Sequence, residues 1–433
     1  MKILFALDPW IYRDTVGDQL YTLENIFVDS IKSLFDYGHE VRLILGEDMA
    51  EAINQKNINL ACEVFTIPLQ ELYKIHDSHY QAHQAQYDDT ETAEQSKAFK
   101  KLVVEQLGEW EPEVIISFTT PVSVWKKCYP EALSMQFENG IFSRTPYPYL
   151  CQLDPFGFLA KSYAAVFSKE LRDSDISPEQ SSRISKLKIE YEHNIFDKFN
   201  PFSREGLVDY KEQKVVLVPL SYNGVIINDA ASKYKSQLDF LLDVMYRVPK
   251  DTIVLFTKHS LQMKGEIPAK TEEYLMKKFP NLRYDEKFDR YAFASQWLTP
   301  LVDGIISINS TVAYHGAFWS KKVFTVGECE INSVATAENL DKIEGYLAEP
   351  DKQDKKANNV LYHLLSRYCF RLEDFWDAKW LADRLEKLIA SQKIGKLETD
   401  FTGMPLLGDE DKIFDSLLKD SPAMKEGYQP RLR

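Results

Sequence analysis

The chain opens with KILFAL at residues 2–7, QLYTLENIFVDSIKSLFDY at 19–37 and EVRLIL at 40–45. The two apolar runs predict buried strands, and the amphipathic stretch between them, which stops at Gly38, predicts a helix. A strand, a helix and a second strand in this order favour a doubly wound parallel sheet. The turn after the first strand lacks GxGxxG, which removes most of the support for a dinucleotide-binding dehydrogenase.

A second α/β series follows later in the chain. Buried strands are predicted at VVLVP (215–219), TIVLFT (252–257) and DGIISI (303–308), and the last is followed by a helix over 311–319. Residues 177–205 are charged and predict a helical connection between the two series. The predicted domains are an N-terminal Rossmann-like domain at 1–200, a second one at 201–345, and C-terminal helices with a tail at 346–433 that pack back on the first.

Composition excludes several classes of protein. The 433 residues include 66 acidic and 52 basic side chains, for a net charge of −14, and no basic run is long enough for general nucleic-acid binding. The five cysteines are widely spaced without CxxC, which disfavours a disulfide framework or zinc knuckle and predicts a reducing cytoplasm. No apolar stretch approaches the length of a membrane span.

Small polar residues follow the predicted strand at 303–308. In an open α/β sheet, ligands bind at the carboxyl ends of the strands, so we expect Asn309, Ser310 and Thr311 to face a ligand at the start of a helix. Glu328, after the next strand, is expected at the same edge, where its carboxylate would suit ribose hydroxyls. The alternative is a plain helix cap and a surface glutamate.

Three further segments carry candidate chemistry. Lys258 and His259 follow a buried strand and suit a phosphate ester, or are a solvated lysine and a packed histidine. Glu138 at a strand end is a candidate acid or base, or a residue that fixes its loop. Asp229, the acid of the loop that starts near Ser221, is a candidate nucleophile or the N-cap of a helix beginning near residue 230.

His76, His79 and His83 have the spacing of one helix face. Three imidazoles so placed could bind a metal, but their polar neighbours and their distance from any predicted strand end favour a solvated helix face. No DxD pair flanks a strand. The sequence therefore predicts neither a metal site nor another cofactor.

The segments together resemble the capsule polysaccharide biosynthesis superfamily, which includes retaining β-Kdo transferases of bacterial surface glycans. The resemblance rests on ENG (138–140), LDPFG (153–157), VPL (218–220), KH (258–259) and INSTVAYHGAFWSKKVFTVG (308–327). It covers roughly residues 114–330. It implies a GT-B architecture, with two Rossmann-like domains facing across a cleft and C-terminal helices.

The resemblance also implies a reaction and a set of site residues. CMP-β-Kdo would be the donor, and transfer would retain the anomeric configuration. His259, Ser310, Thr311 and Glu328 would hold the CMP moiety, together with Lys258 and Asn309. Asp229 would be the nucleophile and Glu138 would act on the acceptor hydroxyl, with the substrate contacted by the four residues Asn139, Gly140, Ser221 and His315.

We therefore expect a cytoplasmic glycosyltransferase of lipopolysaccharide O-antigen or capsule biosynthesis, working at the inner face of the inner membrane. Its partners would be the nucleotide sugar, a lipid-linked or oligosaccharide acceptor and other glycan assembly enzymes, with peripheral membrane contact and no nucleic acid. Two alternatives stay open. One is a GT-B transferase or epimerase that uses a UDP-, GDP- or dTDP-sugar, and the other is a non-catalytic subunit of a glycan assembly complex.

Overall fold

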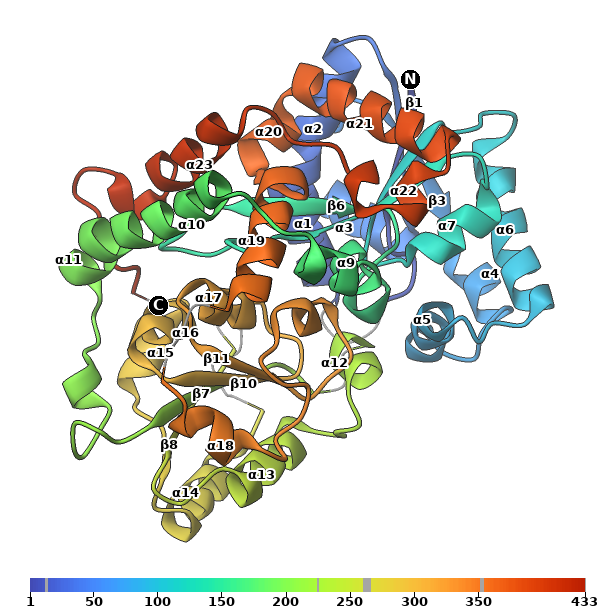
Figure 1. Ribbon diagram of the computed structural model, residues 1–433. Helices are drawn as coiled ribbons and strands as arrows, with labels where there is room; N and C mark the ends of the chain where they lie inside the picture. The colour runs from blue at the N-terminus through green and yellow to red at the C-terminus, as the bar shows by residue number, and fades with distance from the viewer. Residues whose placement is uncertain (12–14, 224–225, 260–265, 351–353, 433) are drawn as a thin grey trace. The chain divides into compact units, whose positions relative to one another are not determined.

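The computed structural model describes residues 1–433 except 12–14, 224–225, 260–265, 351–353 and 433 (Figure 1). The chain forms two compact units, each built around its own sheet. Unit 1 comprises residues 1–139, 151–163 and 367–406. Unit 2 comprises residues 140–150, 164–366 and 407–433.

Unit 1 contains a seven-stranded sheet in the order β12-β6-β5-β4-β1-β2-β3. Its described pairings are parallel, apart from the antiparallel pair β5–β6. The strands are β1 (Lys2–Leu7), β2 (Glu40–Gly46), β3 (Glu63–Ile67), β4 (Val114–Phe118), β5 (Leu133–Asn139), β6 (Leu150–Asp154) and β12 (Cys369–Arg371). Successive residues of β1 and β4 are buried, as in a parallel sheet covered on both faces.

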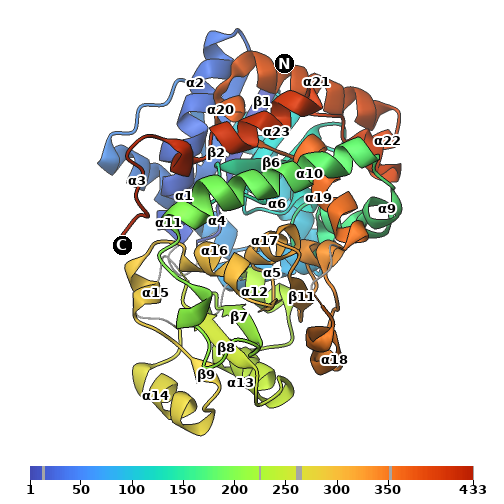
Figure 2. The same ribbon diagram turned by 60° about the vertical axis from the view of Figure 1, so that its left-hand side comes forward.

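Helices surround this sheet in both ribbon views (Figures 1 and 2). They are α1 (Thr15–Thr22), α2 (Val28–Asp36), α3 (Glu47–Lys56), α4 (Leu69–Tyr73), α5 (His79–Asp88), α6 (Ala93–Leu107), α7 (Val122–Cys128), α20 (Leu372–Trp376), α21 (Ala378–Lys393) and α22 (Lys396–Thr399). One π-helical turn, Leu23–Phe27, joins α1 to α2. The predicted helix over 19–37 is therefore present with a local widening.

The C-terminal part of unit 1 completes its core. Phe375 of α20 is fully buried, with its ring 5.0 Å from that of Phe137 and 6.0 Å from that of Phe27. Ser30 donates a hydrogen bond to the Phe375 carbonyl, and Trp376 donates one to the Ile26 carbonyl. Residues far apart in sequence thus form one hydrophobic core.

Unit 2 contains a five-stranded sheet in the order β11-β10-β7-β8-β9, and all its described pairings are parallel. The strands are β7 (Val215–Pro219), β8 (Ile253–Thr257), β9 (Leu282–Arg283), β10 (Gly304–Ser307) and β11 (Lys322–Thr325). Its helices are α9 (Ser168–Asp173), α10 (Pro178–Tyr191), α11 (Asp197–Phe199), α12 (Ile226–Ala231), α13 (Gln237–Arg247), α14 (Ala269–Lys278), α15 (Lys287–Arg290), α16 (Ala294–Leu298), α17 (Val312–Phe318), α18 (Ile343–Ala348), α19 (Lys355–Arg367) and α23 (Glu410–Lys419). The short α8 (Tyr163–Val166) begins with the last residue of a unit 1 segment and continues into unit 2.

Both sheets have the same doubly wound order. The first strand of each unit lies between the second and the fourth, so the chain reverses direction across the sheet between β1 and β4 in unit 1, and between β7 and β10 in unit 2. Ligands of doubly wound folds bind at this switch point, outside the carboxyl ends of the strands. The predicted α/β class with two Rossmann-like sheets is confirmed.

The division of the chain differs from the predicted boundary at residue 200. Residues 140–150 join unit 2 because Phe142 and Tyr147 pack in an aromatic cluster with Tyr191. Residues 178–191 are no linker: α10 packs on α23, and Tyr191 donates a hydrogen bond to the Leu417 carbonyl. The C-terminal region is shared, with 367–406 in unit 1 and the rest in unit 2.

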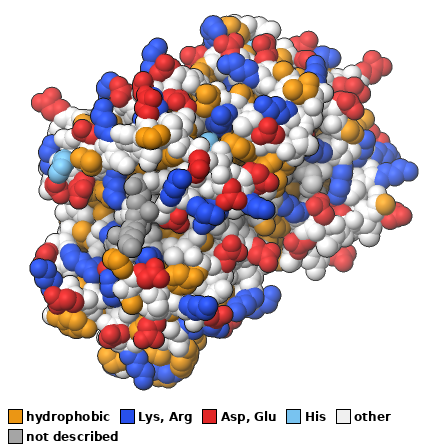
Figure 3. All heavy atoms as spheres, in the orientation of Figure 1, with side chains coloured by type: hydrophobic (Ala, Val, Ile, Leu, Met, Phe, Trp, Pro, Cys, Tyr) orange, Lys and Arg blue, Asp and Glu red, His pale blue; other side chains and the backbone are white. Residues whose placement is uncertain are grey.

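The described helices include none that is long and apolar enough to cross a membrane. On the face drawn in Figure 3, acidic and basic side chains are interspersed and form no single-sign stripe.

Candidate functional site

The carboxyl edge of the unit 2 sheet gathers most of the predicted site residues. Ser221 follows β7, His259 follows β8, Ser310 follows β10 and Glu328 follows β11. Because the strands are parallel, these loops meet at one edge, and the loops after β7 and β10 flank the switch point. We call these four loops the unit 2 edge.

The loop after β10 is ordered by short-range hydrogen bonds. The buried Ser307 hydroxyl accepts from the Ser310 backbone N–H at 2.8 Å, and the Ser310 hydroxyl accepts from the Val312 N–H at 3.4 Å. Within the described chain, the Thr311 side chain makes no capping bond to α17. The side chains of Asn309, Ser310 and Thr311 are half-buried, so the predicted cap is made by Ser310 while the loop stays partly open to solvent.

The loops after β7 and β8 are tied to each other. Asn228 donates a hydrogen bond to the Ser221 hydroxyl at 3.2 Å and another to the Tyr222 carbonyl. The Ser221 N–H donates to Gln237 at 3.0 Å. The rings of Tyr222 and His259 have centroids 4.2 Å apart. Ser221 and His259 therefore belong to one packed edge, as their positions after parallel strands predicted.

The charge of Lys258 is already paired within unit 2. Its ammonium lies 3.0 Å from a carboxylate oxygen of Glu272 and 4.2 Å from the centroid of the Tyr284 ring. Both members of the ion pair are largely buried. A phosphate at Lys258 would have to compete with the Glu272 carboxylate, so the structure favours a role for Lys258 in holding α14 to the sheet.

The loop after β11 approaches the β10 loop closely at Gly327. A Cβ on this residue would lie 2.7 Å from the Ile308 carbonyl oxygen and 2.8 Å from that of Ala231. The Val326 N–H donates to Ser307 and the Glu328 N–H donates to Ala231, which fixes the backbone on both sides. The Glu328 side chain is exposed, so its carboxylate extends from a firmly held backbone into solvent.

Asp229 is the fourth residue of α12, which begins at Ile226. The alternative that Asp229 caps a helix starting near residue 230 is therefore wrong. Its side chain is half-buried. It follows Asn228, whose carboxamide binds the β7 loop, so Asp229 is carried by a helix tied to the unit 2 edge.

Glu138 and Asn139 belong to unit 1, where they are the last residues of β5. The strand continues through Asn139 because it pairs with the antiparallel β6, with Glu138 opposite Gln152 and Asn139 opposite Cys151. Both side chains are half-buried. Gly140 is buried and begins the segment that joins unit 2, where its N–H donates to the Leu150 carbonyl at 2.9 Å.

His315 lies inside the core of unit 2. It is 1% exposed, its Nε2 donates to the Ile141 carbonyl at 2.7 Å, and its ring lies 4.7 Å from that of Tyr147. Burial lowers the pKa of His315 to about 4. The predicted substrate contact does not fit this environment, because the neutral imidazole holds the segment of residues 140–150 within the aromatic cluster.

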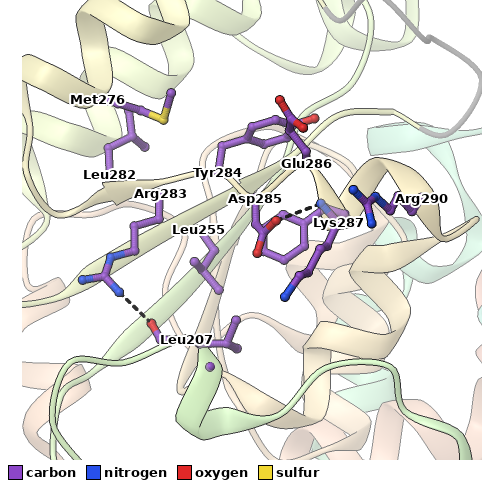
Figure 4. Close-up of a pocket in the computed structure, with 12 residues that line it drawn as sticks. Leu207, Leu255, Met276, Leu282, Arg283, Tyr284, Asp285, Glu286, Lys287 and Arg290 are labelled. Atoms are coloured by element: carbon purple, nitrogen blue, oxygen red, sulfur yellow. Dashed lines mark hydrogen bonds between the residues drawn. The ribbon is translucent and has the colours of Figure 1, made fainter.

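A pocket of about 490 Å³ lies along β8 and β9 of unit 2 (Figure 4). It is lined by Leu255, Arg283, Tyr284, Asp285, Lys287 and Arg290, among others. Arg283 binds the Leu207 carbonyl and pairs with Asp209. None of the predicted site residues lines the described pocket. One of its lining side chains, Tyr284, contacts the Lys258 ammonium with its ring.

The three histidines of the predicted helix face are buried, so the expectation of a solvated face is wrong. His76 lies 3.1 Å from Glu91, and His79 accepts a hydrogen bond from the Ile11 N–H at 2.6 Å. His83 lies 3.3 Å from Asp8, which directly follows β1. Each has a different partner, and the described residues contain no cluster able to hold a metal ion.

The sequence interpretation missed Asp8 as a candidate. The available signal was its position at the end of the first buried strand, the same kind of position that identified Lys258 and Ser310. Its contact with His83 could not be read from the sequence, since 75 residues separate them. The pair lies at the switch point of unit 1, between the ends of β1 and β4.

No protein-family model matches the chain, and no curated protein matches it by sequence. Similar solved structures include the KpsC β-Kdo 2,4 transferase of Thermosulfurimonas dismutans, with 13% identity, 57% of this chain and 79% of that chain covered, and a TM-score of 0.40. The KpsC β-Kdo 2,7 transferase of the same organism has 11% identity, 88% and 100% coverage, and a TM-score of 0.41.

The UDP-GlcNAc 2-epimerase of Methanocaldococcus jannaschii is also similar, with 12% identity, 84% and 99% coverage, and a TM-score of 0.33. The solved structures that the chain resembles thus include glycosyltransferases and a sugar-nucleotide epimerase. At these identities and TM-scores, the likeness carries no argument about donor or reaction. The case for function rests on the chain's own residues.

Proposed function

We propose that the chain is a GT-B glycosyltransferase that binds a nucleotide-activated sugar at the unit 2 edge. The observation that carries this proposal is the convergence of Ser221, Tyr222, His259 and the Asn309–Thr311 loop on the switch point of a five-stranded parallel sheet. These side chains are half-buried and carry donors and acceptors suited to ribose and phosphate oxygens.

Within this proposal, the donor is CMP-β-Kdo and the acceptor is a lipid-linked or oligosaccharide glycan of lipopolysaccharide or capsule. The support is the run of motifs from ENG at 138–140 to the glycine at 327, which resembles the Kdo transferase group. The reaction would take place in the cytoplasm, at the inner face of the inner membrane, and it needs no metal ion. Ser310, Thr311 and His259 would contact the nucleotide.

The proposed reaction has two displacements. In the first, an Asp229 carboxylate oxygen attacks the anomeric carbon, the bond to the phosphate oxygen breaks and CMP leaves with the electron pair. In the second, the acceptor hydroxyl oxygen attacks the same carbon from the other side and releases Asp229, while its proton passes to Glu138. Two inversions retain the anomeric configuration.

The donor is tested by thermal unfolding of the full chain with CMP, UMP, GMP, AMP and dTMP at equal excess. A ligand at 100 times its dissociation constant stabilises the folded state by about 2.7 kcal/mol. Stabilisation by CMP alone is the expected result. A response to UMP, GMP or dTMP instead would replace the donor by the corresponding sugar nucleotide, and silence from all five would contradict the proposal.

The nucleophile is tested by Asp229→Asn with CMP-β-Kdo as donor. The variant should bind CMP like the wild type but lose transfer by roughly 10³-fold or more, because an amide cannot form the glycosyl ester. Asp239→Asn is the matched control, since Asp239 is an exposed acid in the first turn of the neighbouring α13. Undiminished transfer by Asp229→Asn would remove the covalent step.

A further inference from the structure

The switch point of unit 1 holds a buried pair of titratable side chains. Asp8 is 1% exposed and His83 is 3% exposed, and Nδ1 of His83 lies 3.3 Å from an Asp8 carboxylate oxygen. Thr119, the residue after β4, donates from its hydroxyl to the same oxygen at 3.3 Å. Thr119 has φ +69°, a costly conformation for a β-branched residue that clusters at functional sites.

The contacts of His83 fix the orientation of its ring. Its Nε2 lies 3.2 Å from the Thr119 carbonyl oxygen, which can only accept, so Nε2 donates there. Its Nδ1 then faces the Asp8 carboxyl. Burial raises the pKa of Asp8, and the nearby His83 opposes that shift.

Two buried carboxamides of unit 1 lack partners. Gln86, one turn along α5 from His83, and Gln136 on β5 are both 0% exposed. Among the described residues, neither their Nε2 nor their Oε1 atoms have a hydrogen-bond partner. Buried polar atoms are almost always paired, because leaving one unpaired costs about as much as losing a hydrogen bond. Four such atoms point to an absent molecule.

One loop approaches both Gln136 and α5, the helix that carries Gln86. Gln136 pairs in register with Ser117 of β4, whose hydroxyl donates to the Thr120 carbonyl beside Thr119. A Cβ on Gly157 would lie 3.8 Å from Oε1 of Gln136. The next residue, Phe158, has its ring 4.8 Å from that of Tyr87, which follows Gln86. The loop of residues 157–158 thus lies near the Gln136 carboxamide and against Tyr87, the neighbour of Gln86 on α5.

We propose that Gln86 and Gln136, with the Asp8–His83 pair, bind hydroxyl groups of a neutral sugar. A carboxamide offers both a donor and an acceptor, as does each hydroxyl it would meet. A phosphate or carboxylate would lie beside the buried Asp8 carboxyl, and Lys161, the ammonium near Tyr87, is already paired with Asp89.

This inference rests on the proposed function, and it names the acceptor class that unit 1 would hold. Sugar binding is therefore measured without nucleotide, so that the sugar-binding inference and the proposed nucleotide-binding function can fail separately. The probes are glucose, galactose and N-acetylglucosamine as neutral sugars, with Kdo and glucuronate as anionic ones, each titrated into the full chain and followed by thermal unfolding. A response to CMP with no response to any sugar overturns this inference alone.

The decisive variants are Gln86→Leu and Gln136→Leu. Each removes unpaired buried polar atoms, so the sugar-free chain should unfold at a higher temperature than the wild type. Each should also weaken the response to the neutral sugar by roughly tenfold or more. Gain of stability with loss of binding is the expected signature.

Gln95→Leu is the matched control within unit 1. Both carboxamide atoms of Gln95 are paired, to the Thr92 N–H and to the Ile75 carbonyl, so this variant should lose stability and keep its sugar response. The inference is overturned if no neutral sugar stabilises the wild type, if the anionic sugars stabilise it more, or if the Gln86→Leu and Gln136→Leu variants respond like the wild type. The last result would mean that internal water fills the space.

Discussion

The two sheets have the same strand order, but their switch points differ in what covers them. In unit 2, Ser221 and Ser310 are half-buried neutral side chains on loops held by their own backbone bonds. In unit 1, Asp8 and His83 are buried as a pair. A half-buried polar edge can exchange water for a ligand directly, whereas a buried one must open first. The difference favours unit 2 as the side that binds the nucleotide.

The cores of the units also differ in how the chain supplies them. Unit 1 takes Phe375 from a segment more than 200 residues beyond β6. Unit 2 takes Phe142 and Tyr147 from the segment that directly follows β5. Each unit therefore depends on residues that the linear order assigns to its neighbour, and single substitutions can test the two dependences separately.

Phe375→Ala should have the largest effect on stability. Removing a fully buried phenylalanine side chain costs about 3–5 kcal/mol, because the cavity left beside Phe27 and Phe137 cannot collapse fully. Urea unfolding measures this loss, while stabilisation by the bound nucleotide reports on unit 2 and should persist. The control is Phe35→Ala, whose ring is 52% exposed. A loss below about 1 kcal/mol would mean that residues 367–406 do not complete the unit 1 core.

His315→Gln should reveal a pH dependence that belongs to unit 2. Burial lowers the pKa of His315 from an ordinary 6.5 to about 4. Between these pH values the imidazole stays neutral in the folded chain, whereas it takes up a proton in the unfolded chain. Stability from this group is present above pH 6.5 and is lost as the pH falls to 4, by about 3 kcal/mol. The gap in unfolding free energy between wild type and variant should shrink by that amount between pH 6.5 and 4, and a gap of constant size would rule out this account of His315.

Asp154→Asn should reveal the opposite slope in unit 1. Burial raises the pKa of Asp154 from 3.8 to about 6, although Tyr368 and the N–H groups of Phe156, Gly157 and Tyr163 hydrogen-bond to its carboxyl. The folded chain then holds its proton more tightly, so this stability is present below pH 3.8 and is lost as the pH rises to 6, by about 3 kcal/mol. Unfolding at pH 4 and 6 measures it, and a gap between wild type and variant that does not change with pH would contradict the assignment.

The strands of both sheets were predictable because they are short buried apolar runs. The predicted bounds of Lys2–Leu7 and Val215–Pro219 agree with β1 and β7. The edge positions of Ser221, His259 and Ser310 followed from the same reasoning, since the carboxyl ends of parallel strands must meet. These inferences need only local sequence and one rule of topology.

Long-range packing was not predictable from the sequence. The extension of β5 through Asn139 depends on pairing with β6, and the place of His315 depends on a loop 174 residues away. The ion pair of Lys258 with Glu272 likewise changed an expected phosphate ligand into a paired side chain. In each case the residue type was compatible with two roles, and a distant partner decided between them.

Gly327→Ala should have the smallest effect, and it tests whether the unit 2 edge must be so tightly packed. The added methyl would meet the carbonyl oxygens of Ile308 and Ala231, and because these are backbone atoms they cannot rotate away. We expect a loss of about 1–3 kcal/mol on urea unfolding. Gly345→Ala is the control, since the space around its Cβ position is open in the described structure and alanine suits the interior of α18.

Because the added methyl in Gly327→Ala would move the loops after β10 and β11, the response to nucleotide should weaken in this variant while the sugar response of unit 1 persists. Equal weakening of both responses would mean that the two edges are not independent, and the comparison between them would lose its basis.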